Sequence, residues 1–277
     1  MRLDRALVAR GLARSRTHAH ALIAAGAVTV DGAVATRPAA SVSEEADITA
    51  TDDGYVSRAA HKLIGALDAC APYGLSVAGA NALDAGASTG GFTQVLLERG
   101  AHHVTAIDVG HGQLSPVIAS DPRVTAIEGL NIRDLTVAHL TAANVEGALD
   151  LIVADLSFIS LTLVTAPLAA TMASGNLVLM VKPQFEVGRE RLGAAGVVTR
   201  PDDHAWAVAN VAEALVREGA AIHSVERSPL PGLTGNVEFF IWASLAWQAR
   251  GGDDAERPLL RGAALTAAIE SVTKGRL

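Results

Sequence analysis

The stretch from Asn81 to Phe92 constrains the fold more than any other part of the sequence. It reads N-A-L-D-A-G-A-S-T-G-G-F, an apolar strand pattern that breaks into a loop of glycine and small residues and is followed by a helical pattern. Gly86, Gly90 and Gly91 allow a tight turn and a close approach between backbone and ligand, which a Cβ atom would hinder. This order of strand, loop and helix predicts an open α/β sheet with a ligand at the loop.

Two aspartates indicate which ligand the loop would take. Asp84 comes at the carboxyl end of the first strand, the edge at which open α/β sheets bind ligands. Asp108, seventeen residues after Gly91, ends a second strand pattern and is placed to accept both hydroxyls of a ribose. The spacing therefore predicts a bound nucleoside.

The spacing of the glycines distinguishes between nucleotide ligands. NAD-binding loops read G-x-G-x-x-G, whereas this loop reads G-A-S-T-G-G, and a pyrophosphate also needs more open amides at the helix start. S-adenosylmethionine fits better, with Asp84 facing its ammonium group and Asp108 facing its ribose. A second interpretation stays open, because loops of this kind also occur for packing reasons alone.

Length and composition limit the class of protein. A chain of 277 residues is long enough for about two domains with a well-buried core. No apolar stretch reaches the ~18 residues of a membrane span, and no charged-then-apolar leader opens the chain. Cys70 is the single cysteine, and no H-x-x-x-H pair stands beside an acid. We expect a soluble, cytoplasmic protein with no disulfide, no metal requirement and no stable membrane association.

Charge is distributed unevenly along the chain. The formal net charge is −7, but residues 1–40 carry six arginines and two aspartates, which gives +4, and the remainder carries −11. A concentrated basic region of this kind is typical of a nucleic-acid contact surface. The N-terminal part is therefore the candidate nucleic-acid-binding region.

The N-terminal pattern predicts a small α-α-β unit. Leu3 and Leu7 mark a short amphipathic helix, and Ser15 can cap a second helix that ends at Gly26. The stretch V-T-V-D-G-A-V then alternates around an Asp-Gly turn, which predicts a hairpin. The unit is about fifty residues long, and an acidic, polar stretch at residues 44–54 separates it from the next patterned region.

The same residues resemble a known RNA-binding module. The string R-L-D-x-x-L-x-x-x-G-L-A-x-S-R-x-x-A-x-x-L-I-x-x-G-x-V-x-V-D-G is similar to the module of ribosomal protein S-four, also found in pseudouridine synthases and some tRNA synthetases. The resemblance implies that Arg5, Arg14 and Arg16 meet RNA phosphates, and we expect Arg58 to join them. The alternative is a basic face that is merely solvated.

Four polar residues in the second region stand at the ends of regular patterns or interrupt one. Lys62 lies in the first turns of a helical segment, and Asp155 ends a nearly continuous apolar run typical of a buried parallel strand. Lys182 ends another such run, since Pro183 removes a ladder donor. Glu238 interrupts an apolar strand pattern at residues 236–242 and needs a partner, for which Lys182 or Lys62 is the candidate.

The order Lys, Asp, Lys, Glu resembles the tetrad of FtsJ-type ribose 2′-O-methyltransferases. Together with the N-terminal module, the strings L-D-A-G-A-S-T-G-G-F-T, D-V-G-H-G-Q-L, N-I-R-D-L, D-L-S-F-I-S-L, V-K-P-Q-F-E and G-N-V-E-F-F resemble the TlyA family. That family was historically labelled hemolysins and is regarded as rRNA 2′-O-methyltransferases. The resemblance implies methylation of ribose, in cytidines of ribosomal RNA, with ribosomal subunits as partners.

The resemblance also implies roles for individual residues. The implied catalytic group is Lys62, Asp155, Lys182 and Glu238. The residues expected to bind S-adenosylmethionine are Asp84, Gly86, Ala87, Ser88, Thr89, Gly90, Asp108 and Asp134.

The predicted architecture has two folded parts. We expect an S-four-like RNA-binding domain at 1–50 and a linker at 51–56. A Rossmann-like, doubly wound and mostly parallel methyltransferase domain follows at 57–250, and its last strands include an antiparallel one that carries Glu238. A C-terminal loop starting at Gly251 and an alanine-rich helix complete the chain at 251–277.

Three other functions remain as alternatives. A pseudouridine synthase shares the N-terminal module but would leave the glycine loop and Asp108 without a role. A membrane-active, hemolysin-like protein would need an apolar span or a strongly amphipathic basic helix. A non-catalytic RNA-binding protein of ribosome assembly would never transfer a methyl group to RNA.

Overall fold

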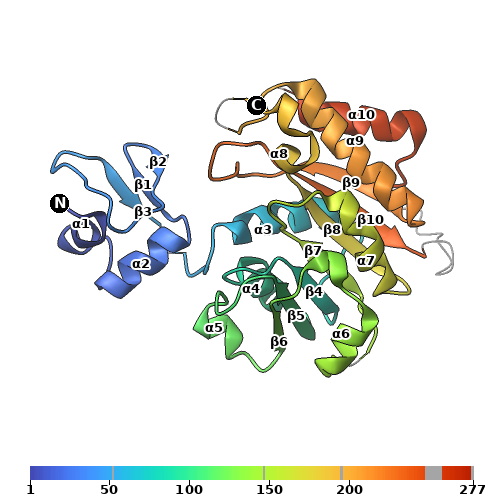
Figure 1. Ribbon diagram of the computed structural model, residues 1–277, viewed down its shortest axis with the longest axis horizontal. Helices are drawn as coiled ribbons and strands as arrows, with labels where there is room; N and C mark the ends of the chain where they lie inside the picture. The colour runs from blue at the N-terminus through green and yellow to red at the C-terminus, as the bar shows by residue number, and fades with distance from the viewer. Residues whose placement is uncertain (52, 146, 194–195, 247–257, 276–277) are drawn as a thin grey trace.

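The computed structural model describes residues 1–51, 53–145, 147–193, 196–246 and 258–275. Figure 1 shows a small N-terminal module set beside a larger α/β domain, with α3 (Ala59–Cys70) at the junction between them. None of the helices within these ranges is long and apolar enough to cross a bilayer.

The N-terminal module consists of two helices and a three-stranded antiparallel sheet in the order β2-β1-β3. Its elements are α1 (Leu3–Ala9), α2 (Arg16–Ala24), β1 (Val28–Val30), β2 (Ala33–Val34) and β3 (Ile48–Ala50). Ser15 caps α2 as the sequence predicted, with its side chain accepting from His18 N at 3.1 Å.

The third strand of the module was not predicted. β3 pairs with β1 along residues 48–50, so the acidic stretch interpreted as a separator is in part an element of the module. Asp47 N donates to the side chain of Asp31 at the hairpin turn, which draws the returning chain onto the sheet. Only three residues with one buried side chain form β3, too short a pattern to stand out in the sequence.

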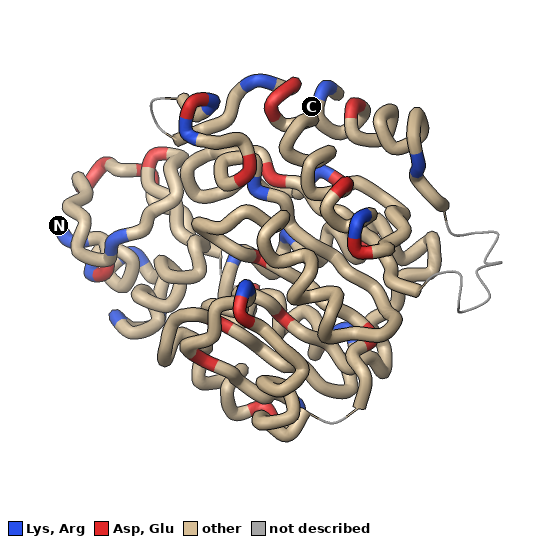
Figure 2. Tube along the Cα trace, turned by 45° about the vertical axis from the view of Figure 1, so that its right-hand side comes forward, with Lys and Arg blue, Asp and Glu red and all other residues tan. Residues whose placement is uncertain are grey.

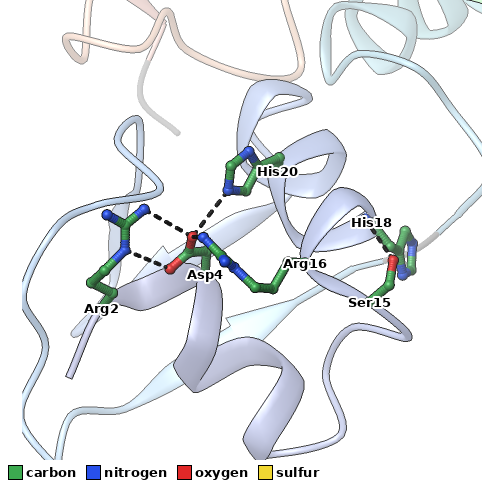
Figure 3. A network of polar contacts seen from close by, with 6 residues as sticks. All are labelled: Arg2, Asp4, Ser15, Arg16, His18 and His20. Carbon is green, nitrogen blue, oxygen red and sulfur yellow. Dashed lines mark hydrogen bonds and ion pairs between the residues drawn. The ribbon is translucent and has the colours of Figure 1, made fainter.

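One buried carboxylate joins the two helices of the module (Figure 3). Asp4 is fully buried, and its Oδ2 lies 2.9 Å from Nη2 of Arg2, 2.9 Å from Nη2 of Arg16 and 3.0 Å from Nε2 of His20. Hydrogen bonds from Arg2 and His20 hold the pKa of Asp4 far below its usual range. Asp4 of α1 therefore binds two basic side chains of α2 together with Arg2, which directly precedes α1.

The larger domain is built on one seven-stranded sheet in the order β6-β5-β4-β7-β8-β10-β9. β4 to β8 run parallel, and β10 is antiparallel to both of its neighbours. The strands are β4 (Asn81–Ala85), β5 (His103–Asp108), β6 (Val124–Glu128), β7 (Leu151–Ala154), β8 (Gly175–Val181), β9 (Ala221–Arg227) and β10 (Phe239–Leu245). The doubly wound, mostly parallel sheet predicted from the sequence is confirmed.

Helices cover both faces of this sheet, because alternate residues of the buried strands face opposite sides. One face packs on α3 and α4, and the other on α6, α7, α9 and α10. The helices after α3 are α4 (Gly91–Glu98), α5 (Pro116–Ala119), α6 (Val137–Ala142), α7 (Thr165–Ala170), α8 (Pro183–Glu186), α9 (Pro201–Arg217) and α10 (Gly262–Lys274). Short 3₁₀ turns lie at η1 (Ala71–Tyr73), η2 (Ile132–Asp134), η3 (Leu161–Leu163) and η4 (Arg189–Arg191).

The expected alanine-rich C-terminal helix is α10, which packs against α9 and β9. The loop expected to start at Gly251 lies outside the described residues.

Arg58 connects the two parts of the chain. Its backbone N–H donates to Ala25 O at 2.8 Å, and its Nη2 donates to Pro231 O at 2.8 Å. A Cβ atom on Gly26 would stand 2.6 Å from Cδ of Arg58, so the arginine stem packs directly on the end of the module. This arginine, expected to meet RNA, thus also has a structural contact on each side of the junction.

Replacing Asp4 by Asn tests the buried carboxylate. A depressed pKa contributes stability that is present above the unfolded value of about 3.9 and is lost as the pH falls below it. We expect Asp4→Asn to lower the hydrogen-exchange protection of α1 and α2 at pH 7. The difference in protection between the variant and the wild type should become smaller toward pH 3, where the wild type begins to lose the contribution of the Asp4 carboxylate. Asp68→Asn, which removes the exposed Asp68–Arg99 pair, is the control and should leave the module unchanged. Equal protection of α1 and α2 in Asp4→Asn and the wild type at pH 7 would contradict this role.

Candidate active site

Two ion pairs bring the four predicted polar residues together. Lys62 Nζ lies 2.5 Å from Glu238 Oε2, and Lys182 Nζ lies 2.7 Å from Asp155 Oδ1. Lys182 Nζ also donates a hydrogen bond to Ser157 Oγ at 2.9 Å. All four residues line one cleft of about 520 Å³, here called the tetrad cleft.

The sheet explains why residues so far apart in sequence meet. Asp155 follows β7 and Lys182 follows β8, and the carboxyl ends of these parallel strands share one edge of the sheet. The register pairs Phe239 with Val181, so Glu238 stands beside Lys182 at the same edge. Lys62 reaches this edge from the first turns of α3, as the sequence predicted.

Glu238 stands just before a strand, where the sequence placed it within one. β10 begins at Phe239. Asn236, three residues earlier, bonds to a different segment: its Oδ1 accepts from Val198 N at 2.9 Å, and its Nδ2 donates to Gly196 O at 3.1 Å. The partner of Glu238 is Lys62, one of the two lysines that the sequence left open.

The ion pairs balance charge among side chains that are mostly buried. The side chains of Lys62 and Glu238 are 9% and 3% exposed, and those of Lys182 and Asp155 are also mostly buried. Each ammonium has one carboxylate, so the group of four carries no net charge when all are ionised. An unpaired charge at this depth would be strongly destabilising.

A second, larger cleft meets the tetrad cleft. This strand-end cleft, about 900 Å³, lies at the carboxyl ends of β4, β5 and β7 and is lined by Asp108 and by apolar residues including Val109, Ile132 and Leu156. The residues that line both clefts are Gly86, Ser88, Asp155, Ser157 and Phe185. A molecule in one cleft can therefore reach a molecule in the other at Asp155 and Ser157.

Asp108 is fixed within the strand-end cleft by backbone amides. Its Oδ2 accepts from Ser88 N at 2.9 Å, and its Oδ1 accepts from Gly110 N at 2.7 Å. These bonds orient a carboxylate at the end of β5, where the sequence expected it to accept ribose hydroxyls.

The glycines of the loop make room for other parts of the chain. At Gly86, where φ is +85°, a Cβ atom would stand 2.7 Å from the carbonyl oxygen of Asp155. At Gly91 it would stand 2.8 Å from Cβ of Ser57, just before α3. The glycine pattern thus brings the loop against the chain segments that carry Asp155 and Lys62, a packing role that the sequence had left as an alternative.

Asp84 does not face either cleft. Its side chain is fully buried, Oδ2 accepts from the Thr93 hydroxyl at 2.7 Å, and Oδ1 has no partner. Burial raises the pKa of Asp84 to about 7. The sequence could not show that Asp84 lies one residue short of the strand end, with α4 packed over it.

Most, but not all, of the other residues expected to bind the donor line one or both clefts. Ser88 lines both, whereas Ala87 and Thr89 line the tetrad cleft. Gly90 and Asp134 line neither, and the Asp134 side chain is 64% exposed. The sequence missed Ser157, Gln184 and Phe185, although all three occur in the strings that carried the family resemblance: D-L-S-F-I-S-L and V-K-P-Q-F-E.

A doubly wound sheet with two adjoining clefts at its carboxyl edge defines an α/β protein with a ligand site at that edge. The family model described as FtsJ-like methyltransferase matches residues 55–245, and the model described as S4 domain matches residues 1–48. The chain belongs to the FtsJ-like methyltransferase family, in the TlyA group that carries an N-terminal S4 domain.

Relatives match almost the whole chain. The protein is 48% identical to the 16S/23S rRNA (cytidine-2′-O)-methyltransferase TlyA of Mycobacterium tuberculosis, over 92% of this chain and 95% of that protein. It is 35% identical to Hemolysin A of Brachyspira hyodysenteriae, over 86% of this chain and 98% of that protein. A solved structure of a candidate hemolysin from Streptococcus thermophilus superposes with a TM-score of 0.71 at 31% identity, covering 99% of this chain and 94% of that one.

Asp84→Asn tests the placement of the buried acid. A raised folded pKa means that the folded state keeps a proton that the unfolded state has released, so stability falls as the pH rises from about 3.9 toward the folded value. Asn cannot ionise, so we expect the variant to gain on the order of 2 to 4 kcal/mol relative to the wild type between pH 4 and pH 8. Urea unfolding at both pH values measures this difference. A difference between the two proteins that does not change with pH would contradict the burial of an ionisable group.

Proposed function

We propose that the protein transfers a methyl group from S-adenosylmethionine to the 2′-hydroxyl of a ribose in ribosomal RNA, with cytidine as the target nucleoside. The observation that supports this most is the junction of the two clefts at Asp155 and Ser157, with the Lys182 amine directly beside it. A donor in one cleft and a ribose in the other would meet at a paired amine and carboxylate.

The strand-end cleft has the groups that a nucleoside donor needs. Asp108 offers an oriented carboxylate to ribose hydroxyls, Val109 and Ile132 offer apolar surface to a base, and Gly86 keeps the loop close to Asp155. S-adenosylmethionine, when bound, supplies an electrophilic methyl group. Because Asp84 lies behind the loop, we assign it an indirect role through Thr93 and the start of α4.

The tetrad would act on the acceptor ribose. As a neutral amine, Lys182 takes the proton of the 2′-hydroxyl, whereas as an ammonium it donates a hydrogen bond to the hydroxyl oxygen and only orients it. Asp155 aligns Lys182, and Lys62, held by Glu238, contacts the hydroxyl oxygen or the adjacent phosphate. Positioning is the larger contribution, since near-attack geometry supplies on the order of 7 to 11 kcal/mol and a positioned acid or base roughly 10²- to 10⁴-fold.

The N-terminal module would bring RNA to the tetrad cleft. Figure 2 shows basic segments on this module, and its residues 23–26 and Thr36 form one wall of the cleft. Arginine contacts to phosphate supply affinity that does not depend on sequence and that weakens with salt. The 16S/23S activity in the name of the Mycobacterium relative supports ribosomal subunits, in the cytoplasm, as the substrate.

Simple assays distinguish two alternative functions from the proposed methyl transfer. A non-catalytic assembly protein would bind RNA without transferring a labelled methyl group to small or large ribosomal subunits. A membrane-active protein, suggested by the hemolysin names of two relatives, would release dye from liposomes.

Lys182→Ala tests the proposed catalytic centre. We expect methyl transfer to isolated ribosomal subunits to fall about 10²- to 10⁴-fold, because the group that acts on the hydroxyl proton is lost. Binding of S-adenosylmethionine by calorimetry should stay within a few fold. Lys274→Ala, which removes an exposed ammonium on α10, should transfer methyl groups normally. A folded Lys182→Ala protein with near-normal turnover would eliminate the scheme.

The double variant Arg5→Ala and Arg14→Ala tests the RNA-binding surface. Arg16 is left in place because it also pairs with Asp4. Each lost phosphate contact should lower the slope of log K against log salt by about 0.7 to 0.9. Filter binding to ribosomal RNA over a range of salt concentrations measures the slope, with Arg217→Ala on α9 as the control. A slope identical to that of the wild type would argue against these contacts.

A further inference from the structure

Glu186 is a buried acid that the proposed reaction does not use. It ends α8, four residues after Lys182, and is 8% exposed. It lines neither the tetrad cleft nor the strand-end cleft. A carboxylate in this position needs hydrogen bonds to offset its burial.

Both oxygens of Glu186 are bound by a segment that lies earlier in the chain. Oε2 accepts from Ser160 Oγ at 2.5 Å, and Oε1 accepts from Leu161 N at 2.8 Å. Burial raises the pKa of Glu186, although these two bonds favour its charged form. The acid therefore joins the segment after β8 to the segment after β7.

The segment held by Glu186 carries groups that face both clefts. Ser157 accepts the hydrogen bond from Lys182 Nζ, and Ser157 and Phe158 line the strand-end cleft. Phe158 has φ of +64°, a left-handed conformation that side chains other than glycine rarely adopt. Such a backbone persists only where the surrounding structure holds it, and the bonds to Glu186 come two and three residues later.

We propose that Glu186 is a positioning residue for Lys182. Through Ser160 and Leu161 it fixes the segment 157–161, so that the Ser157 hydroxyl and Asp155 together set the direction of the Lys182 amine. This inference concerns the same site as the proposed function. Its kinetic tests rest on that function, because they measure the rate of methyl transfer.

Two replacements of Glu186 distinguish positioning by hydrogen bonds from a requirement for charge. In Glu186→Gln the carbonyl oxygen can still accept from Leu161 N, and the amide can donate to Ser160 Oγ, because a hydroxyl also accepts. In Glu186→Ala both bonds are lost. We expect kcat to fall at least about 10-fold in Glu186→Ala with little change in the KM for RNA, and to stay within about 3-fold of the wild type in Glu186→Gln.

Coupling between Glu186 and Ser157, measured by kcat in a double variant, distinguishes a positioning role of Glu186 from general destabilisation. If Glu186 acts through Ser157, the double variant Glu186→Ala and Ser157→Ala should have the kcat of Ser157→Ala alone, because Glu186 has nothing left to position once the Ser157–Lys182 bond is gone. Ile269→Ala, in the buried face of α10, serves as a control of lowered stability and should keep the kcat of the wild type per folded molecule.

A measurement that needs no methyl transfer completes the test. The NMR chemical shift of the Lys182 side chain, observed with labelled lysine at one pH, should change in Glu186→Ala in the same direction as in Ser157→Ala. This chemical shift should stay unchanged in Ile269→Ala and nearly unchanged in Glu186→Gln.

Three results would overturn the inference: an unchanged Lys182 chemical shift in Glu186→Ala, additive losses of kcat in the double variant, or a Glu186→Gln protein as poor as Glu186→Ala. A wild-type protein that transfers no methyl group to RNA would refute the proposed function, and the chemical shift would then decide the inference alone.

Discussion

Charge pairing at the carboxyl edge of the sheet is the constraint on which the rest of the site depends. Two ammonium groups lie in a largely buried junction, and each has a carboxylate within 2.7 Å. Removing one member of such a pair leaves an uncompensated buried charge, at a cost of about 3 to 5 kcal/mol. The four residues are therefore stable there only as complete pairs. The need for pairing links α3, which carries Lys62, to the segment before β10, and it links the segment after β7 to the segment after β8.

The antiparallel strand β10 is what makes this pairing possible. A parallel strand at this position would start at the opposite edge of the sheet, but β10 runs against β8, so the residue before it lies at the carboxyl edge. Glu238 thereby faces Lys62, while Lys182 remains with Asp155 and Ser157. One lysine is anchored from α3 and the other from the sheet, and the space between them opens toward the N-terminal module.

Much of this arrangement could be predicted because its patterns are long or strongly periodic. The apolar runs before Asp155 and Lys182 identify two buried strands, and parallel strands share their ligand edge, so both residues could be placed there. The pairing partner of Glu238 could be narrowed to Lys62 or Lys182, because a lone glutamate in an apolar pattern needs a partner. Only the three-dimensional register decides between them.

Other features have no signal in a single sequence. β3 is three residues long and depends on a partner strand about twenty residues earlier. Asp84 is one residue short of the strand end, and a shift of one residue moves a side chain to the other face of a strand. Ser160 and Glu186 both stand in strings that carried the family resemblance, D-L-S-F-I-S-L and V-K-P-Q-F-E. Their contact joins two loops whose proximity is set by the sheet order, so the sequence could not show that the two residues pair.

The location of the transferred methyl group tests the central claim most directly. Ribosomal subunits incubated with the protein and isotope-labelled S-adenosylmethionine would be digested to nucleosides and analysed by mass spectrometry. The arrangement of Lys182, Asp155 and Ser157 beside the strand-end cleft predicts the label on the 2′-oxygen of a ribose. The likeness to the Mycobacterium relative predicts cytidine as the nucleoside, so the product would be 2′-O-methylcytidine. Label on a base, or no label on either subunit, would contradict a tetrad that acts on a ribose hydroxyl.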